Sequence, residues 1–200
     1  MAFLSFLKNI VAPEITVVSG LPRSGTSMMM KMLEAGGIPP LQDNIRTADE
    51  DNPKGYYEFE RVKKLPKDTA WLPEAKGKAV KIIALLLTKL PLKGYRYKVL
   101  FMRRDIEEIL ASQKRMLVRR GEATDKVSDE EMITTYHQHL SEVLSFLDAN
   151  PCFSVLYINY NDMLRDPSDW VPRINEFLGG GLDTEAMKSV VDPKLYRNRR

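Results

Sequence analysis

The sequence predicts an α/β protein with three layers, α/β/α, around a central parallel sheet. Four short apolar runs rich in β-branched or aromatic residues predict strands, the first and third of them buried, and segments with helical periodicity separate them. Strands that alternate with helices form βαβ units, in which the strands are parallel and the crossovers right-handed. The length of 200 residues and the apolar content of 44% suit one domain over residues 1–200. Ligands are expected beyond the carboxyl ends of the strands.

The expected elements follow in chain order. Strands are predicted at residues 15–19, 78–83, 97–102 and 153–158. Helices are predicted at residues 24–35, 84–90, 106–119, 128–147, 166–178 and 183–191, with a short helical piece that ends at 71–73. Capping signals mark several ends, such as the pair Ser128 and Glu131, and Asp166 followed by Pro167. The expected core includes residues 85–87 and a stripe of the long helix formed by Met132, Ile133, Tyr136, Leu140, Val143, Leu144 and Leu147.

The net charge and the cysteine content limit which binding partners and which cellular compartment are expected for this protein. The formal net charge is only +3, so the sequence does not predict a general nucleic-acid binder. Residues 192–200 form a basic tail that either is solvated or meets an anionic ligand. Cys152 is the single cysteine, which excludes an internal disulfide and favours the cytoplasm. The apolar extension at residues 1–12 is too short to span a bilayer, so it predicts docking on the domain, with membrane-surface contact as the alternative.

The loop after the first strand has the composition of an anion-binding site. Residues 20–27 read Gly-Leu-Pro-Arg-Ser-Gly-Thr-Ser, and an apolar helix follows. A loop that enters a helix N-terminus directs backbone N–H groups and the positive end of the helix dipole at one point, where a phosphate can bind. Gly25 lets the backbone approach the anion, and the hydroxyls of Ser24, Thr26 and Ser27 add donors. An ordinary strand-to-helix turn is the alternative interpretation.

This loop departs from the Walker A pattern at one position. The pattern G-x-x-x-x-G-K-[ST] has a lysine after its second glycine, to reach the β and γ phosphates, whereas this chain has Thr26 there. The cation is Arg23, two residues before Gly25. The run Pro22-Arg23-Ser24-Gly25-Thr26-Ser27 instead resembles the 5′-phosphosulfate loop of sulfotransferases that use 3′-phosphoadenosine 5′-phosphosulfate (PAPS).

A second motif follows the third predicted strand. Arg104 comes just past the strand end, and Ser112 lies a little over two helical turns further along. Both can reach one anion if the strand end and the helix curl around it. The run from Arg104 to Ser112 resembles the 3′-phosphate motif R-[DN]-P-x-[DE]-x-x-x-S of the same family, with Ile106 in place of the usual proline.

Two further segments extend the resemblance over most of the chain. The run Tyr160-Asn161-Asp162-Met163-Leu164, ahead of Asp166-Pro167, is similar to the family segment Y-E-D-L…D-P, although Asn161 replaces the usual glutamate. Residues 52–58 resemble the N-P-x-G-Y-[FWY]-E stretch of bacterial sulfotransferase-like proteins. The chain thus resembles the bacterial sulfotransferase family, which implies a P-loop NTPase-like sulfotransferase fold.

The resemblance also implies an activity and a set of roles. A sulfotransferase moves a sulfuryl group from PAPS to a hydroxyl or amine, and leaves adenosine 3′,5′-bisphosphate (PAP). Arg23 would neutralise charge on the bridging oxygen and the 5′-phosphate, which the rest of the loop from Pro22 to Ser27 would hold. Arg104 and Ser112 would grip the 3′-phosphate, and Tyr160 would contact the adenine side. No metal is expected, because arginine and backbone amides carry the charge.

The general base is less apparent from the pattern. Cytosolic steroid and phenol sulfotransferases use a histidine, but His137 and His139 lie beside the buried stripe of the long helix, where a structural or surface role is expected. Glu58 is the candidate base and Glu60 the reserve, since a carboxylate can accept the proton if partial burial raises its pKa. Residues 41–75 are predicted to form an acceptor-site insertion for a small molecule, a lipid or a carbohydrate, and a solvated loop anchored by aromatic residues is the alternative interpretation.

Two other functions stay open at this point. A magnesium-dependent P-loop kinase or NTPase would need a substitute for the missing lysine at Thr26. A noncatalytic nucleotide-binding protein would keep Arg104 and Ser112 and tolerate the loss of Glu58.

Overall fold

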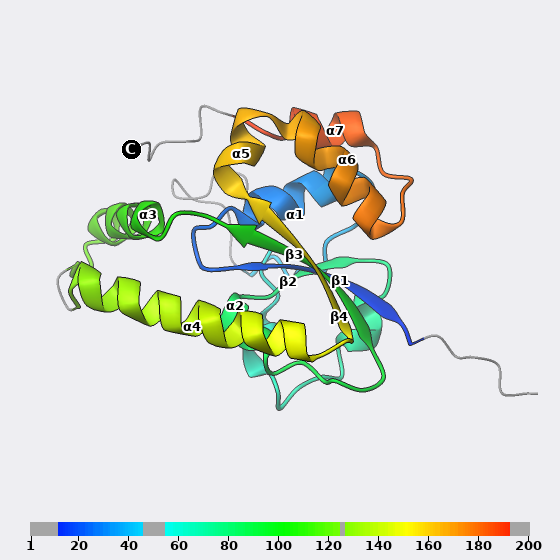
Figure 1. Ribbon diagram of the computed structural model, residues 1–200, viewed down its shortest axis with the longest axis horizontal. Helices are drawn as coiled ribbons and strands as arrows, with labels where there is room; N and C mark the ends of the chain where they lie inside the picture. Colours follow the sequence, from blue (N-terminus) through cyan, green and yellow to red (C-terminus); the bar gives the residue numbers. More distant parts are fainter. Residues whose placement is uncertain (1–11, 46–54, 125–126, 193–200) are drawn as a thin grey trace, which may run out of the picture.

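A parallel sheet forms the centre of the computed structural model, which describes residues 12–45, 55–124 and 127–192 (Figure 1). Its strands are β1 (Glu14–Gly20), β2 (Ala79–Lys81), β3 (Arg96–Arg103) and β4 (Phe153–Asn159). Their order across the sheet is β2-β1-β3-β4, and each neighbouring pair is parallel. The predicted parallel sheet is therefore confirmed.

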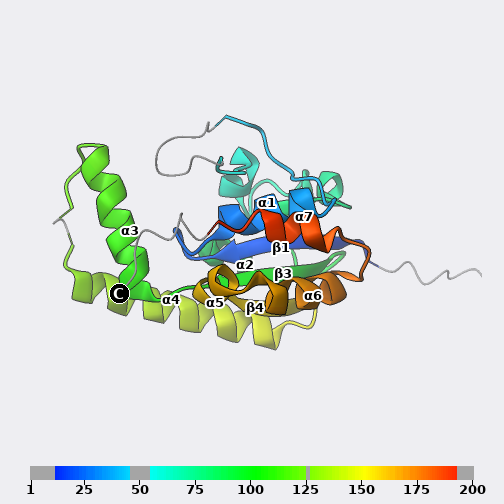
Figure 2. The same cartoon turned by 90° about the horizontal axis from the view of Figure 1, so that it is seen from above.

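Helices cover both faces of this sheet. One face carries α1 (Thr26–Ala35), α5 (Tyr160–Arg165), α6 (Pro167–Leu178) and α7 (Thr184–Ser189), above the strands in Figure 1. The other face carries α2 (Ala84–Leu87), α4 (Asp129–Ala149) and the 3₁₀ helices η1 (Glu60–Lys64) and η2 (Leu72–Ala75). Seen from above, α1 and α7 lie side by side, and α6 lies over β3 and β4 (Figure 2). The predicted three-layer architecture is confirmed.

The side chains of the central strands alternate between the two faces of the sheet, which explains why both faces are covered by helices. Val17 and Val99 belong to the core on the α2 and α4 side, whereas Val18 and Leu100 belong to the core under α1 and α6. All four side chains are fully buried. Successive side chains of a strand point to opposite faces, so a strand that is apolar throughout requires a layer on each side.

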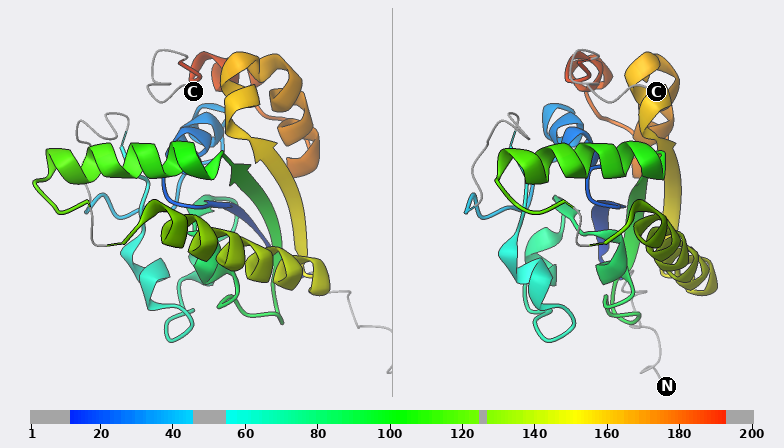
Figure 3. Two further views of the ribbon diagram at one scale, coloured as in Figure 1. Left: turned by 60° about the vertical axis from the view of Figure 1, so that its left-hand side comes forward. Right: turned by 90° about the vertical axis from the view of Figure 1, so that its left-hand side faces the viewer.

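The sheet order creates a gap where a ligand can bind. From β1, the chain proceeds to β2 on one side and then crosses to β3 on the other, which makes the space between β1 and β3 a topological switch point. Gly20 pairs in register with Met102 at the carboxyl ends of these strands. The loops that follow β1 and β3 therefore leave the sheet beside each other. Helix α3 (Ile106–Arg119) continues from β3 past the sheet, with α4 beneath it (Figure 3).

The predicted helix caps are present. Ser128 and Glu131 form a reciprocal capping box, with hydrogen bonds of 3.2 and 3.3 Å between each side chain and the other residue's backbone N–H. The Asp166 side chain accepts from the backbone N–H of Ser168 at 2.8 Å, and Pro167 occupies the first turn of α6. These short-range signals correctly located the starts of α4 and α6.

Several expectations about the elements were wrong. The second strand covers only Ala79–Lys81, because β2 is an edge strand and the chain turns into α2 at Ile83. Leu85 is 42% exposed rather than buried, since α2 is a single turn that directs only one side toward the core. Trp71 precedes a 3₁₀ helix instead of ending one. Of the seven stripe residues of α4, only Val143 and Leu147 are fully buried, because the helix extends beyond the sheet.

Two predicted segments fall largely outside the described residues. These are the N-terminal extension at residues 1–12, of which only residue 12 is described, and the basic tail at residues 192–200, of which only residue 192 is described.

Helix α5 was not predicted. It begins at Tyr160, where the Asn159 side chain accepts from the backbone N–H groups of Asn161 and Asp162 at 2.9 and 3.1 Å.

Candidate functional site

The loop between β1 and α1 has, at residue 25, a backbone conformation and a close approach that glycine alone fits. Gly25 has a φ of 98°, and a Cβ added there would lie 2.3 Å from the Tyr160 ring. Arg23 also has a positive φ, 69°, which is uncommon outside glycine and costs strain. The loop is therefore held in a specific shape by its contact with α5 as well as by its own sequence.

The N-terminus of α1 opens into a cavity of about 500 Å³. Among the described residues, no side chain caps this helix and its first turn carries no acidic residue. Its unpaired N–H groups and the positive end of its dipole are consequently suited to an anion. The cavity lining includes five of the six predicted loop residues, namely Pro22, Arg23, Gly25, Thr26 and Ser27.

Ser24 and Ser27 differ from the simple picture of three hydroxyls directed at one anion. The Ser24 side chain is 1% exposed, does not line the cavity, and its Oγ has no hydrogen-bond partner within the described part of the chain. Ser27 Oγ donates to the backbone carbonyl of Tyr56 at 3.4 Å. Of the three predicted hydroxyls, that of Thr26 belongs to a residue that lines the cavity, whereas Ser24 is buried away from it and Ser27 binds the Tyr56 carbonyl. The roles of Ser24 and Ser27 in anion binding stay predictions.

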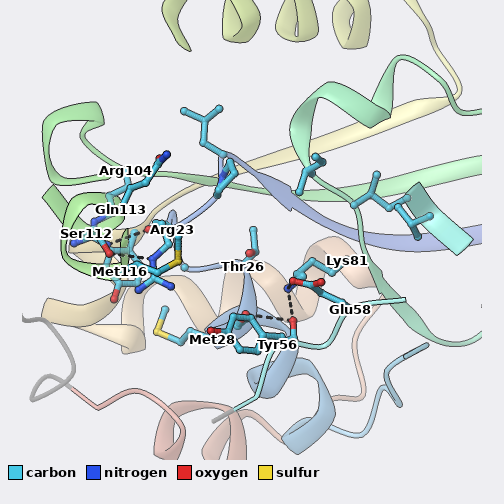
Figure 4. A pocket seen from close by; sticks show the side chains of 18 of the residues that line it. Arg23, Thr26, Met28, Tyr56, Glu58, Lys81, Arg104, Ser112, Gln113 and Met116 are labelled. Carbon is cyan, nitrogen blue, oxygen red and sulfur yellow. Dashed lines mark hydrogen bonds and ion pairs between the residues drawn. The ribbon is translucent and has the colours of Figure 1, made fainter. Parts of the chain in front are cut away.

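The loop and helix α3 meet directly at one end of the cavity (Figure 4). The Nε of Arg23 donates to Ser112 Oγ at 3.0 Å, and a guanidinium N–H of Arg104 donates to the carbonyl of Arg23 at 3.0 Å. The two motifs that the sequence places far apart are therefore joined by side-chain contacts. The expected pairing is different in detail, because Ser112 contacts Arg23 and Arg104 binds the loop backbone.

A buried network fixes Arg104. Its Nε donates to a Glu108 carboxylate oxygen at 2.9 Å, and these two side chains are 6% and 7% exposed. The other carboxylate oxygen of Glu108 accepts from the Asn161 amide at 3.1 Å. The Arg104 guanidinium also lies over the Tyr160 ring, 4.7 Å from its centroid. Asn161, where the family pattern has glutamate, is thus a neutral donor to Glu108.

Tyr160 lies between the loop and Arg104. It lines the cavity, packs its ring against Gly25 and is 8% exposed. Burial raises the pKa of its hydroxyl, and the nearby charges of Arg104 and Arg23 partly oppose that shift. The ring therefore stays neutral and supports the loop. Its predicted contact with adenine stays a prediction.

Glu58 lies at the other end of the cavity, across Thr26 from Arg23 (Figure 4). Two ammonium groups lie near its carboxylate, that of Lys63 at 3.6 Å and that of Lys81 at 3.9 Å. Lys81, at the end of β2, also donates to the carbonyl of Tyr56. Glu60, the reserve candidate, does not line the cavity and pairs with Lys63 at 2.5 Å. Of the two candidate carboxylates, only that of Glu58 therefore belongs to a residue that lines the cavity.

The segment that carries Glu58 is attached to α1. Tyr57 has a φ of 54°, and its hydroxyl donates to Glu34 of α1 at 2.6 Å. Burial and this hydrogen bond raise the pKa of Tyr57 well above its usual range. The Tyr56 carbonyl accepts from Ser27, in the first turn of α1, and from Lys81 of β2, so the segment is attached to both ends of α1 and to the edge strand.

The sequence interpretation missed several cavity residues. Lys81 was assigned only to a strand, and Arg119 and Arg120 only to a helix end, but all three line the cavity. On α3, residues 112, 115, 116 and 119 recur at intervals of three and four, and each of them lines the cavity. Helical spacing after the Ser112 motif is a signal that could have found them.

Other expected features can be placed more briefly. His137 and His139 lie on α4 and do not line the cavity. In the described ranges, no group of three or more His, Cys, Asp or Glu side chains could hold a metal ion. No helix within those ranges is long and apolar enough to cross a membrane. Residues 52–54 of the predicted N-P-x-G-Y motif lie outside the described residues.

The family follows from a comparison of the sequence with known families. A model described as "Sulfotransferase domain" matches residues 13–198. The chain therefore belongs to the sulfotransferase domain family. None of the curated proteins compared with the chain matches it.

Solved structures show the same fold at low sequence identity. The sulfotransferase domain from the Synechococcus PCC 7002 olefin synthase is 18% identical with a TM-score of 0.58, over 91% of this chain and 85% of that one. Sulfotransferase STF1 from Mycobacterium tuberculosis H37Rv is 17% identical with a TM-score of 0.58, over 91% and 72%. Retinol dehydratase, crystallised with androsterone and the inactive cofactor PAP, is 18% identical with a TM-score of 0.48, over 92% and 66%. The first two establish the sulfotransferase fold.

Proposed function

We propose that this protein transfers a sulfuryl group from PAPS to a hydroxyl or amine of a small acceptor. One observation carries the proposal: the Arg23 side chain contacts Ser112 at 3.0 Å, so the loop before α1 and the motif of α3 border one cavity. Two anion-binding segments at one switch point suit a donor with two separated phosphate groups. Membership of the sulfotransferase family supports the same donor.

The residues have distinct proposed roles. Arg23, Thr26 and the N–H groups at the start of α1 would hold the 5′-phosphate, with the loop from Pro22 to Ser27 as its frame. Ser112, with Arg104 behind the loop, would hold the 3′-phosphate. PAPS would supply a sulfur atom bonded to an oxygen of the 5′-phosphate, the bond that breaks. Tyr160 would contact the adenine side from beneath the loop.

Glu58 would act at the acceptor. Its carboxylate would take the proton of the acceptor as the acceptor oxygen or nitrogen forms a bond to sulfur. The electron pair of the broken bond would leave on the 5′-phosphate oxygen, where Arg23 offsets the new charge. The products would be the sulfated acceptor and PAP, and Glu58 would release its proton to water. The chemistry needs alignment and charge stabilisation, which the positions of Arg23 and Glu58 on either side of Thr26 suit (Figure 4).

The remaining parts of the chain have proposed roles as well. Residues 41–75 would shape the acceptor pocket, since Tyr56, Glu58, Phe59, Val62 and Lys63 line the cavity. Residues 1–12 and 192–200 would be additions to one domain. The cytoplasm is the proposed location, because a chain with one cysteine needs no oxidising compartment.

Ligand-dependent melting tests the donor. At about 100 times its dissociation constant, PAP should stabilise the protein by roughly 2.7 kcal/mol, whereas ATP with Mg²⁺ should have little effect. The variant Thr26→Val should reduce the PAP shift, and Thr135→Val on the exposed part of α4 should leave it unchanged. A larger shift with ATP and Mg²⁺ than with PAP would instead support a kinase or NTPase.

Acid–base catalysis is tested by paired carboxylate variants. We expect Glu58→Gln to lower sulfate transfer by about 10²-fold or more while PAP binding is retained. Glu60→Gln should have little effect, because that side chain does not line the cavity. Loss of activity in Glu60→Gln alone would transfer the role of base to Glu60, and unchanged activity in both would remove a carboxylate base.

A further inference from the structure

We infer that the acceptor carries an anionic group, a carboxylate, sulfate or phosphate, which Arg119 and Arg120 bind while the reacting hydroxyl or amine lies at Glu58. This inference rests on the proposed function, because it names the class of acceptor for that site. Both arginines line the cavity, and neither is part of the proposed donor site.

The cavity concentrates positive charge to a degree that the chain as a whole does not. Of the described residues that line it, seven are lysine or arginine and two are aspartate or glutamate, an excess of five positive charges. The whole chain has a net charge of only +3. Arg115, Arg119 and Arg120 supply three of the seven cations, and all three are exposed residues of α3. A cavity lined mainly by one sign of charge attracts ligands of the opposite sign.

Arg119 and Arg120 lie beyond the part of α3 that meets the loop before α1. Ser112 contacts Arg23 of that loop at 3.0 Å. At a rise of 1.5 Å per residue, the two arginines follow Ser112 by about 10 and 12 Å along the helix axis. Arg115 comes only about one turn after Ser112, so its side chain remains beside the proposed donor site. The other two arginines are therefore the ones assigned to the acceptor.

The C-terminal end of α3 lies on the side of the cavity where the acceptor is expected. The helix begins near α5, where the Arg104 guanidinium lies over the Tyr160 ring, and it runs toward the side of the molecule that holds η1 (Figure 3). Glu58 lies two residues before η1. An acceptor with its reacting group at Glu58 can therefore extend toward the last turn of α3 within one cavity.

The chemistry of the two side chains selects an anion. A guanidinium group is planar and always charged, and it can donate two parallel hydrogen bonds to a carboxylate, sulfate or phosphate. Arg119 and Arg120 are exposed, unlike the buried Arg104, and exposed ion pairs exchange partners at small cost. An acceptor with a cationic group at this place would be repelled, because like charges would be brought together.

A pair of double variants isolates the two arginines. Arg119→Gln/Arg120→Gln removes two positive charges from the cavity lining, and both sites are exposed and glutamine is a good helix former, so this variant should fold. The control is Lys114→Gln/Arg173→Gln. It removes the same charge from two exposed residues, on α3 and α6, that do not line the cavity.

The experiment measures binding to the PAP-loaded protein by calorimetry at neutral pH. The probes are 10-hydroxydecanoate, 1-decanol and 10-amino-1-decanol, which share a flexible ten-carbon chain with a hydroxyl at one end. Their other ends are anionic, neutral and cationic. We expect 10-hydroxydecanoate to bind at least about 10-fold more tightly than the other two. This advantage should shrink as the salt concentration rises from roughly 0.05 to 0.5 M, because salt screens exposed charges.

The variants should change the affinity for one ligand only. Arg119→Gln/Arg120→Gln should weaken binding of 10-hydroxydecanoate by about 10-fold and leave that of 1-decanol unchanged. The Lys114→Gln/Arg173→Gln control should bind both as the wild type does. PAP affinity should be the same in all three proteins, since the two arginines lie outside the proposed donor site.

The results separate the inference from the proposed function. If PAP binds but 10-hydroxydecanoate binds no more tightly than 1-decanol, or if the two double variants behave alike, the acceptor inference is wrong and the donor assignment stands. If Arg119→Gln/Arg120→Gln weakens PAP as much as 10-hydroxydecanoate, the two arginines belong to the donor site and the inference is also wrong. If PAP does not bind to the wild type, the proposed function fails and the acceptor inference fails with it.

Discussion

The two ends of the cavity are built in opposite ways. At the arginine end, formed by Arg23, Arg104, Glu108, Ser112 and Tyr160, the ion pair is 2.9 Å long and its side chains are 6% and 7% exposed. At the glutamate end, formed by Glu58, Lys63 and Lys81, the ion pairs are 3.6 and 3.9 Å long, and Lys63 is 59% exposed. Charges as buried as those of Arg104 and Glu108 must stay paired, whereas the longer and more exposed pair of Lys63 with Glu58 can exchange partners at small cost. Lys81 and Glu58 themselves are 10% and 19% exposed.

This difference suits the two tasks we propose. A donor whose phosphates are the same in every reaction is served by a fixed frame, in which cations and amides need no rearrangement. A general base must release one partner to accept a proton, which longer and more exposed contacts permit. The predictions below test whether the arginine end is rigid and whether the surroundings of the glutamate end depend on weaker interactions.

The largest effect is expected from Glu108→Ala. This change removes the carboxylate partner of the buried Arg104 and the acceptor of the Asn161 amide. Breaking a buried pair by deleting one partner costs about 3–5 kcal/mol, so the free energy of unfolding, measured by urea denaturation, should fall by that amount. Glu107→Ala is the control on the exposed side of the same helical turn and should change stability by less than about 1 kcal/mol. Equal effects of the two variants would mean that the arginine end is not a rigid frame.

A smaller effect separates backbone strain from packing at Gly25. Gly25→Ala and Gly37→Ala both place alanine at a positive φ, 98° and 102°. A Cβ at residue 25 would also strike the Tyr160 ring, whereas residue 37 faces open space. The difference between the two variants in free energy of unfolding should therefore be about 1–3 kcal/mol, the cost of overpacking. PAP affinity should fall in Gly25→Ala alone, and equal affinities would contradict the role of Tyr160 as a support for the loop.

The smallest effect is expected at the surface ion pair that braces η1, which carries the cavity-lining residues Val62 and Lys63. Arg61 donates two hydrogen bonds to the Asp68 carboxylate, of 2.8 and 2.9 Å. This hydrogen bonding lowers the pKa of the Asp68 carboxyl. A lowered folded-state pKa contributes stability above the unfolded value of about 3.9. That contribution is lost as the pH falls through the lower, folded-state value.

The measurement compares urea midpoints of the wild type and Asp68→Asn as the pH falls. The wild type should be slightly more stable near neutral pH, and its advantage should vanish below the unfolded pKa of about 3.9. The pair is partly exposed to solvent, which screens it, so the difference should be much smaller than that caused by Glu108→Ala. An advantage that persists unchanged into acid would show that the carboxylate charge of Asp68 does not brace this segment.

Features with a short sequence range are predictable from the chain alone. The β1 loop, the capping box at Ser128 and the start of α6 at Asp166 follow from residues within a few positions of one another. The strand runs 15–19 and 97–102 are apolar enough to indicate burial on both faces, whereas 153–158 indicates a strand and forms β4 at the sheet edge, where most side chains are only partly buried. The family motifs also locate the five cavity-lining loop residues, because each lies in one continuous run.

The pairings inside the site required the three-dimensional arrangement. The contacts of Arg23 with Ser112 and of Arg104 with the Arg23 carbonyl span 89 and 81 residues. They depend on the register that sets Gly20 opposite Met102, which no local pattern encodes. The proximity of Lys81 to Glu58 likewise depends on where an edge strand ends.

Local patterns in this chain thus predict its layers, the loop before α1 and its family resemblance, because helix caps, strand alternation and loop shape depend on near neighbours. Packing across the sheet establishes which arginine meets which partner, and that Glu58 rather than Glu60 lines the cavity. These relations arise from side chains brought together by strand order, and the free energy of such contacts exists only in the folded chain.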